Sequence, residues 1–113
     1  MTPSYRLLPS AAKDLDDQAG YLMQEASLET ALRFYDATAS TFEMLAREPG
    51  VGERHQSSDL RLDGLRVRRV ERFPNHLIFD RPTDAGIDVA RVLHGARDIG
   101  RMLEEENFGQ EQP

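Results

Sequence analysis

Residues 65–79, with the sequence LRVRRVERFPNHLIF, decide the fold of this chain. Apolar and arginine side chains alternate at the start of this stretch until Val70 falls out of phase, and a bulge near Arg68 and Arg69 would restore the alternation. Such alternation is typical of a strand with one buried face. The stretch therefore predicts a strand that ends at Phe73.

Turn and strand patterns continue on the C-terminal side of this strand. Pro74 and Asn75 predict a turn into a second strand over residues 76–79. A loop over 81–86 then leads to a third alternating stretch, 87–93. Three consecutive strands with short connections predict an antiparallel arrangement.

On the N-terminal side the pattern changes from strand to helix. A short apolar run over 5–8 predicts one strand, and Ser10 offers an N-cap to the helix that follows. Ser27 repeats this start signal for a second helix, which Pro49 ends. Apolar side chains recur at helical spacing in both segments: Ala12, Leu15, Ala19, Leu22 and Ala26, then Leu28, Leu32, Tyr35, Ala39, Phe42 and Leu45. Two helices with so short a link form an antiparallel hairpin.

These elements predict an α+β domain. The N-terminal strand and the two-helix hairpin precede the other strands, so the hairpin would pack on one face of a mostly antiparallel four-stranded sheet. The polar segment 49–59 predicts a loop, and 97–103 predicts a short C-terminal helix. We expect one domain over residues 1–103, followed by an acidic and flexible tail over 104–113.

The charge of the chain is unevenly distributed. Its 113 residues carry a formal net charge of -6 at pH 7, which argues against a protein that coats nucleic acid through bulk charge. Residues 54–101, however, carry ten arginines against seven acids, a net charge of +3. Guanidinium groups suit phosphate and carboxylate partners. Biased codon usage would give the same excess of arginine, so composition alone assigns no function.

Composition also limits the chemistry and the compartment. Cysteine is absent, which excludes disulfides, thiolate metal sites and a cysteine nucleophile. The mean hydropathy of -0.59 and the polar N-terminus predict neither a membrane-spanning helix nor a signal peptide, so we expect a cytoplasmic protein. His55, His76 and His94 are too dispersed for a zinc site, and no glycine-rich phosphate loop occurs. We therefore expect no metal and no cofactor.

Several short strings stand in a fixed order along residues 5–103. They are Tyr5-Arg6-Leu7, Ala12-Lys13-Asp14-Leu15, Ala31, Leu45 through Pro49 to Gly52, Gly64-Leu65-Arg66, His76 to Phe79, and Val92 to Asp98. In this order and spacing, they resemble the ParE branch of the RelE/ParE toxins. The resemblance implies the toxin component of a type II toxin-antitoxin system, encoded beside a small antitoxin that neutralises it.

Two mechanisms belong to this superfamily. The resemblance implies either a ParE-like inhibitor of DNA gyrase without catalytic chemistry, or a RelE-like ribosome-dependent endoribonuclease that cuts messenger RNA. RelE-like toxins combine basic residues with a tyrosine or histidine near the C-terminus, because metal-independent cleavage needs an acid or base and cations. No tyrosine follows Arg66 here, so we interpret the chain as a gyrase inhibitor rather than an enzyme. If it is a nuclease, Arg66, His94 and Arg97 are the candidate catalytic residues. The other alternative is a non-toxic corepressor that only binds the antitoxin.

Five basic residues are the candidates for target binding or toxicity: Arg66, Arg68, Arg69, His94 and Arg97. The strand arginines, together with Arg72, would form a surface cluster, since Arg66 points opposite to Leu65 and Val67 and so away from a core built on those two. Such a cluster suits an anionic partner, and it would equally keep the strand soluble and prevent edge pairing. His94 could also be a structural histidine that fixes the turn before the last helix.

The resemblance also implies partners. We expect the antitoxin to cover apolar surface left by the helical hairpin together with an open sheet edge, since both recur as docking sites for peptides. DNA gyrase is the expected target. Contact with DNA is expected only through the antitoxin, because this chain is acidic, and no membrane contact is expected.

Overall fold

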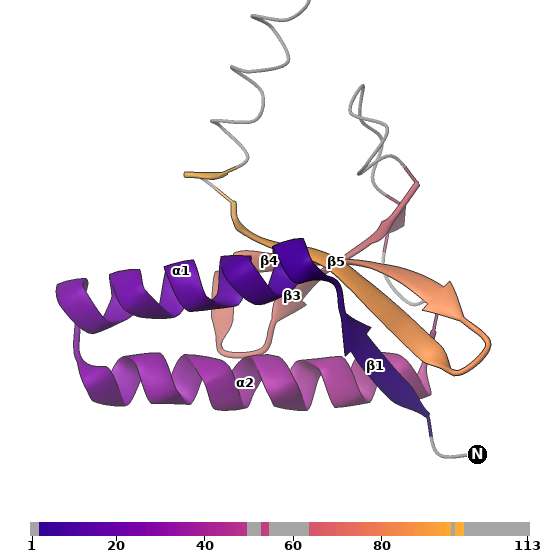
Figure 1. Ribbon diagram of the computed structural model, residues 1–113, viewed down its shortest axis with the longest axis horizontal. Helices are drawn as coiled ribbons and strands as arrows, with labels where there is room; N and C mark the ends of the chain where they lie inside the picture. Colours follow the sequence, from indigo (N-terminus) through magenta and orange to yellow (C-terminus); the bar gives the residue numbers. More distant parts are fainter. Residues whose placement is uncertain (1–2, 50–52, 55–63, 96, 99–113) are drawn as a thin grey trace, which may run out of the picture.

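A hairpin of two helices lies against one face of a five-stranded sheet (Figure 1). The arrangement comes from a computed structural model that describes residues 3–49, 53–54, 64–95 and 97–98. The elements in chain order are β1 (Ser4–Leu7), α1 (Pro9–Glu25), α2 (Leu28–Arg47), β2 (Glu53–Arg54), β3 (Arg66–Val70), β4 (Phe73–Thr83) and β5 (Gly86–His94). The α+β fold is therefore confirmed, and the sheet gains the two-residue strand β2 inside the segment predicted as a loop.

The two helices begin by different means. α1 begins at Pro9, whose fixed φ and missing N–H suit a first helical position, and its N-cap is Leu8 without a side-chain hydrogen bond. The predicted N-cap at Ser10 is wrong because the helix already includes that residue. α2 has the predicted cap, since the Thr30 N–H donates a hydrogen bond to Ser27 Oγ at 3.0 Å. Neither described helix is long and apolar enough to cross a membrane.

The sheet combines parallel and antiparallel pairing. β1 runs parallel to β5, and the strand order is β1-β5-β4-β3-β2. The other pairs are antiparallel, as predicted for β3, β4 and β5, and the unpredicted β2 pairs with β3 in the same way. Gly86 permits the β1 contact, because its φ is +147° and a Cβ there would lie 1.8 Å from Ser4 O. β1 is thus placed at one edge of the sheet by a position that only glycine fits.

The turn between β3 and β4 lies earlier than the sequence predicts. Glu71 and Arg72 form the turn, and the predicted turn residues Pro74 and Asn75 lie within β4. Arg72 adopts φ 69°, a left-handed conformation in which glycine or asparagine is usual, so its residue type does not indicate a turn. The Glu71 N–H donates to Thr41 Oγ1 at 3.1 Å, which fixes this turn against α2.

Two irregularities in strand pairing decide which side chains face the helices. The first is a register shift between Arg69 and Val70, where the sequence predicts a bulge, although the extra residues belong to β4 rather than to β3. The second makes Ala90 the extra residue on β5. As a result Val89 and Val92, which strict alternation would place on opposite faces, both pack against the helices.

Each face of the sheet carries its own apolar cluster. The larger one, here called the helix-side core, contains Ala11, Leu15, Ala19, Ala31, Phe34, Phe42, Leu45, Ala46, Val70, Ile78, Ile87, Val89 and Val92. The smaller one lies on the opposite face and is built on Leu65, Phe79 and Leu93. Because both faces are apolar, alternation along β3 could not show which face the helices cover.

An ion pair joins α1 to β5 at the Ala90 irregularity. Arg91 binds Asp14 through two contacts, Nε to Oδ2 at 2.7 Å and Nη2 to Oδ1 at 3.0 Å. The same Oδ2 atom accepts a hydrogen bond from the Val92 N–H at 3.0 Å. One carboxylate thus binds both a side chain and the backbone of β5, which fixes the helix on the sheet.

The remaining expectations concern the ends of elements. β4 continues to Thr83, so the loop predicted over 81–86 is reduced to a turn before β5. The predicted C-terminal helix over 97–103 lies largely outside the described residues, and the predicted tail over 104–113 lies wholly outside them.

Candidate functional site

The strand arginines divide between the two faces of the sheet. Arg68 pairs with Ile78, a member of the helix-side core, so Arg68 and Arg66 share the face of that core. Arg69 pairs with Leu77, which packs on the cluster of the opposite face. The single surface cluster expected from the sequence is therefore not formed, since two arginines lie on one face and one on the other.

Arg66 lies beside a buried acid on the face that carries the helices, contrary to the expectation that it points away from the core. Its cross-strand partner is Asp80, which is only 2% exposed. Burial raises the pKa of Asp80 to about 6, and the positive charges of Arg68 and Arg66 oppose that rise. Among the described residues, no group donates a hydrogen bond to Asp80 Oδ2. Nothing in the local sequence indicates this buried carboxyl.

His94 ties the end of β5 to the residues that follow it. Its Nδ1 atom accepts a hydrogen bond from the Arg97 N–H at 3.1 Å, and its own backbone N–H donates to Asp98 Oδ2 at 2.7 Å. The Gly95 N–H donates to Asn75 O at 2.7 Å, which closes the same turn. The Nδ1 atom of His94 is therefore engaged with the backbone of the residues that follow β5.

A second histidine, His76, is buried against His94. The two rings meet edge-on with centroids 5.2 Å apart. Gln18 on α1 donates to Val92 O through Nε2 and accepts a hydrogen bond from His76 Nδ1 through Oε1. Burial lowers the pKa of His76 to about 4, assisted by the charges of His94 and Arg97, so this ring is neutral at pH 7. In the part of the chain that the structure describes, no three histidine, aspartate or glutamate side chains group to hold a metal.

A tyrosine lies beside Arg97, although none follows Arg66 in the sequence. The guanidinium carbon of Arg97 is 4.2 Å from the ring centroid of Tyr21, an α1 residue that is 47% exposed. The expected ion pair between Arg97 and Asp98 is also present, at 3.6 Å. Tyr21, His94 and Arg97 thus gather at one place, so the sequence position of the tyrosines does not exclude one from this site.

The strand arginines and the His94 group lie in different parts of the sheet. Arg66 on β3 pairs with Asp80 on β4, and Asp80 pairs on its other side with Val89 on β5. Val89 lies five residues before His94 along β5. With about 3.3 Å per residue along a strand and about 4.8 Å between strands, the Cα atoms of Arg66 and His94 are about 15–20 Å apart. The structure therefore does not bring Arg66 together with His94 and Arg97.

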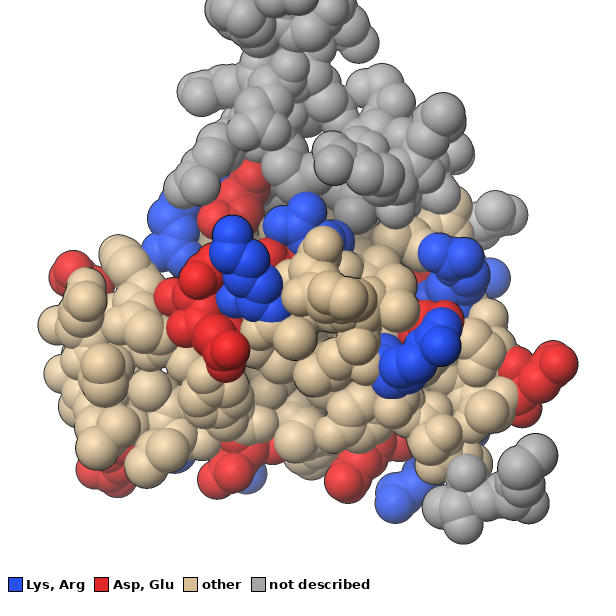
Figure 2. Space-filling view, viewed as in Figure 1, with Lys and Arg blue, Asp and Glu red and all other residues tan. Residues whose placement is uncertain are grey.

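The helical hairpin leaves large apolar side chains exposed. On α2, Leu28 and Leu32 are 59% and 55% exposed, and Tyr35 continues the same stripe one turn later. On α1, Met23 is 49% exposed. Figure 2 shows uncharged atoms over much of the hairpin, with charged side chains around them. Exposed large apolar side chains gathered on one hairpin make it a candidate interaction surface.

A groove of about 410 Å³ lies next to this surface, between β1 and the two helices. The rings of Tyr5 and Phe42 line it with centroids 5.2 Å apart. The Tyr35 hydroxyl donates to Asp16 Oδ1 at 2.7 Å, and this hydrogen bond raises the pKa of Tyr35 to about 12. β1 is an edge strand, so the groove adjoins backbone groups that can pair with an added strand.

An exposed helical hairpin beside a sheet edge is typical of a small protein that works in a complex with another protein. The family described as ParE toxin of type II toxin-antitoxin system, parDE, matches residues 5–99 of the chain. The chain therefore belongs to the ParE toxin family of type II toxin-antitoxin systems.

The structure is also similar to a solved one. A chain from the chromosomal ParDE toxin-antitoxin system of P. aeruginosa superposes with a TM-score of 0.65 at 20% sequence identity. The similarity covers 82% of this chain and 96% of that chain. At this identity the likeness concerns the fold alone. No curated protein sequence matches the chain.

Proposed function

We propose that this ParE-family toxin inhibits DNA gyrase and is neutralised by a cognate antitoxin. The observation that carries the first part is the separation of Arg66 from His94 and Arg97. An acid or base and the cations that stabilise a phosphorane must all reach one phosphate, and a separation of about 15–20 Å between the Cα atoms of Arg66 and His94 does not favour that arrangement. A protein that acts by binding alone does not need Arg66, His94 and Arg97 to meet at one phosphate.

In this proposal the arginines act by contact rather than by catalysis. Arg66 and Arg68 share one face of β3, and we assign them to the target-binding surface because paired cations favour an acidic protein surface or a DNA backbone. Arg69, on the other face, would contribute to a different contact. His94 positions Arg97 through the hydrogen bond at Nδ1.

The antitoxin is assigned to the hairpin and to β1. Leu28, Leu32 and Tyr35 present an apolar stripe on α2, and the β1 edge offers backbone pairing next to the adjacent groove. Covering both would remove exposed apolar surface from water and satisfy the strand edge. DNA contact of the pair then belongs to the antitoxin, because this chain carries a net charge of -6.

One observation favours the endoribonuclease as a second candidate. The Arg97 guanidinium lies over the Tyr21 ring, and the Arg97 backbone N–H donates to His94 Nδ1, so a phenol, a guanidinium and an imidazole lie close together at one partly exposed place. Together they could hold a phosphate and supply an acid or base to it. In that case Arg66 would lie outside the catalytic group.

A paired assay on purified, antitoxin-free protein separates the candidates. Gyrase supercoiling with trapping of cleaved DNA is measured beside primer extension on messenger RNA in a translating extract. Trapped DNA with intact message supports the gyrase proposal, whereas cut message with unaffected gyrase refutes it. If both assays are negative and expression leaves growth unchanged, the chain is a corepressor that only binds its antitoxin.

A further inference from the structure

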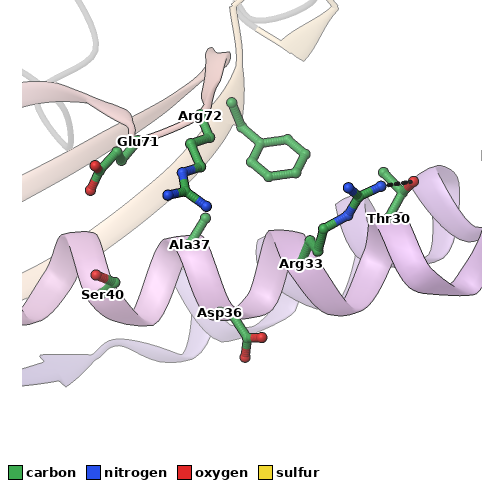
Figure 3. Close-up of a pocket in the computed structure, with 8 residues that line it drawn as sticks. Thr30, Arg33, Asp36, Ala37, Ser40, Glu71 and Arg72 are labelled. Atoms are coloured by element: carbon green, nitrogen blue, oxygen red, sulfur yellow. Dashed lines mark hydrogen bonds between the residues drawn. The ribbon is translucent and has the colours of Figure 1, made fainter.

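A second groove, of about 620 Å³, lies between α2 and the β3–β4 turn. Thr30, Arg33 and Ala37 line it from the helix, and Arg72 and Phe73 line it from the turn and β4 (Figure 3). Volumes of about 300–1,000 Å³ are usual for ligand sites. The groove is large enough for a few residues of a peptide and too small for a folded domain.

Two contacts hold the β3–β4 turn and the start of β4, which form one wall of the groove, against α2. The Glu71 N–H donates to Thr41 Oγ1 at 3.1 Å, and Thr41 is 1% exposed. The Phe73 ring meets Phe34 edge-on at 5.3 Å, and Phe34 is fully buried. Because the turn is held on α2 at two points, the groove is formed before any partner binds.

Two guanidinium groups, those of Arg33 and Arg72, line this groove. Within the described ranges, neither Arg33 nor Arg72 forms an ion pair, although Asp36 and Glu71 line the same groove. The hydrogen bond of Arg33 goes from Nη2 to the Thr30 hydroxyl at 3.4 Å. Figure 3 shows Arg72 directed across the groove toward α2, while Asp36 points away from it. Most donors of both arginines are therefore available to a ligand.

The backbone conformation of Arg72 is a second and independent observation about this groove. Its φ of 69° is the only positive value among the described non-glycine residues. Glycine would adopt this conformation without the steric cost that a Cβ brings. A charged side chain at such a position, on an anchored turn, points to a use for that side chain.

We propose that this groove binds an acidic peptide segment of the antitoxin. Carboxylates of the segment pair with Arg33 and Arg72, because guanidinium groups bind carboxylates through two parallel hydrogen bonds. An adjacent apolar side chain packs on Phe73. A nucleic acid strand fits less well, since the groove offers two arginines beside an apolar ring rather than a continuous row of cations for regularly spaced phosphates. The identity of the partner rests on the proposed function.

The first test needs no antitoxin. The full chain, labelled with ¹⁵N, is titrated with acetyl-Leu-Glu-Leu-Glu-Leu-amide, with the same peptide carrying glutamine for glutamate, and with a thymidine oligonucleotide. The readout is the side-chain Nε–Hε signal of Arg33 and of Arg72. We expect both signals to shift with the acidic peptide alone. Any other pattern, including no shift or a shift with the oligonucleotide, overturns the proposal.

The second test uses the antitoxin. Arg33→Gln combined with Arg72→Gly removes both charges and keeps the turn conformation, while Arg47→Gln removes an exposed arginine of α2 outside the groove. We expect the double variant to bind purified antitoxin at least about tenfold more weakly by calorimetry and the control to bind as the wild type does. Equal affinity of the double variant refutes only this inference. Failure of the wild type to bind refutes the proposed function. The peptide titration then decides separately whether the groove binds an acidic peptide.

Discussion

His76 and Asp80 lie on the same face of β4, and burial moves their pKa values in opposite directions. His76 is 5% exposed and Asp80 is 2% exposed, and between them Ile78 packs in the helix-side core. Burial disfavours the charged form of each, which lowers the pKa of the imidazole and raises that of the carboxyl. The two groups therefore give the stability of the fold opposite dependences on pH.

The stability that protonated Asp80 contributes to the folded protein is lost as pH rises. Its pKa is raised from 3.8 to about 6, so between these values the folded protein holds a proton that the unfolded chain has released. Stability then falls by up to about 3 kcal/mol across this window. Asp80→Asn removes that loss, so we expect the variant to gain stability relative to the wild type from about pH 4 to pH 7 in urea unfolding. Asp84→Asn, in an exposed turn, is the control. A stability difference independent of pH would contradict the assignment.

The effect of His76 on stability has the opposite dependence on pH, because its pKa is lowered by folding. Its pKa is lowered from 6.5 to about 4, so the unfolded chain binds a proton in this window that the folded protein does not. Stability falls by up to about 3 kcal/mol as pH drops through the window. His76→Phe lowers stability overall because Gln18 loses its hydrogen-bond donor. We also expect its stability to decrease as pH rises from about 4 to 6, where the Asp80 effect is unopposed. A wild-type pH profile in this variant would show that His76 does not titrate as described.

Two glycine-to-alanine substitutions test whether the close contact between Gly86 and β1 contributes to stability. Gly86→Ala places a Cβ 1.8 Å from Ser4 O, so it must displace β1 or the turn. We expect a loss of about 2 kcal/mol or more in the free energy of unfolding, and weaker antitoxin binding. Gly20→Ala on α1 meets no atom within 4 Å, and it should stabilise the helix by about 0.5–1 kcal/mol. Calorimetric unfolding of both variants checks the contrast, and similar transition temperatures would count against the close packing at Gly86.

The helical hairpin could be predicted because its determinants are local. The Ser27 cap and the helical spacing of apolar residues lie within the segments that they describe. The β3–β4 turn could not, because a contact with Thr41 on α2 fixes it and holds Arg72 in a conformation that its residue type does not favour. Pro74 offered the stronger local pattern, and tertiary packing overrode it.

The candidate site was harder to predict than the fold for the same reason. Tyr21 and Arg97 are far apart in the sequence and meet only because α1 packs over the end of β5. Asp80 is buried by long-range packing, and the face on which Arg66 lies depends on which side of the sheet the hairpin covers. Periodicity predicts which side chains share a face, but it cannot predict what covers that face.

The apolar stripe on α2 makes a direct prediction about the antitoxin. Leu32 is 55% exposed on this stripe, whereas Met44 is 39% exposed elsewhere on the same helix. Leu32→Glu should weaken antitoxin binding at least about tenfold without changing the fold, because it places a charge in a buried interface. Met44→Glu should leave affinity within about twofold. Surface plasmon resonance on the two variants provides the comparison, and equal affinities would remove this stripe from the interface.

The central claim is that the protein inhibits gyrase by binding and has no catalytic action of its own. The most direct measurement is the amount of cleaved DNA that gyrase traps as purified toxin is added, with wild type, His94→Gln and the double variant Arg66→Gln with Arg68→Gln. We expect trapped DNA to saturate at a fixed ratio of toxin to gyrase, to persist in the His94 variant, and to fall at least about tenfold in the arginine variant. Unaffected gyrase, together with messenger RNA that is cut by the wild type and spared by His94→Gln, would contradict the claim.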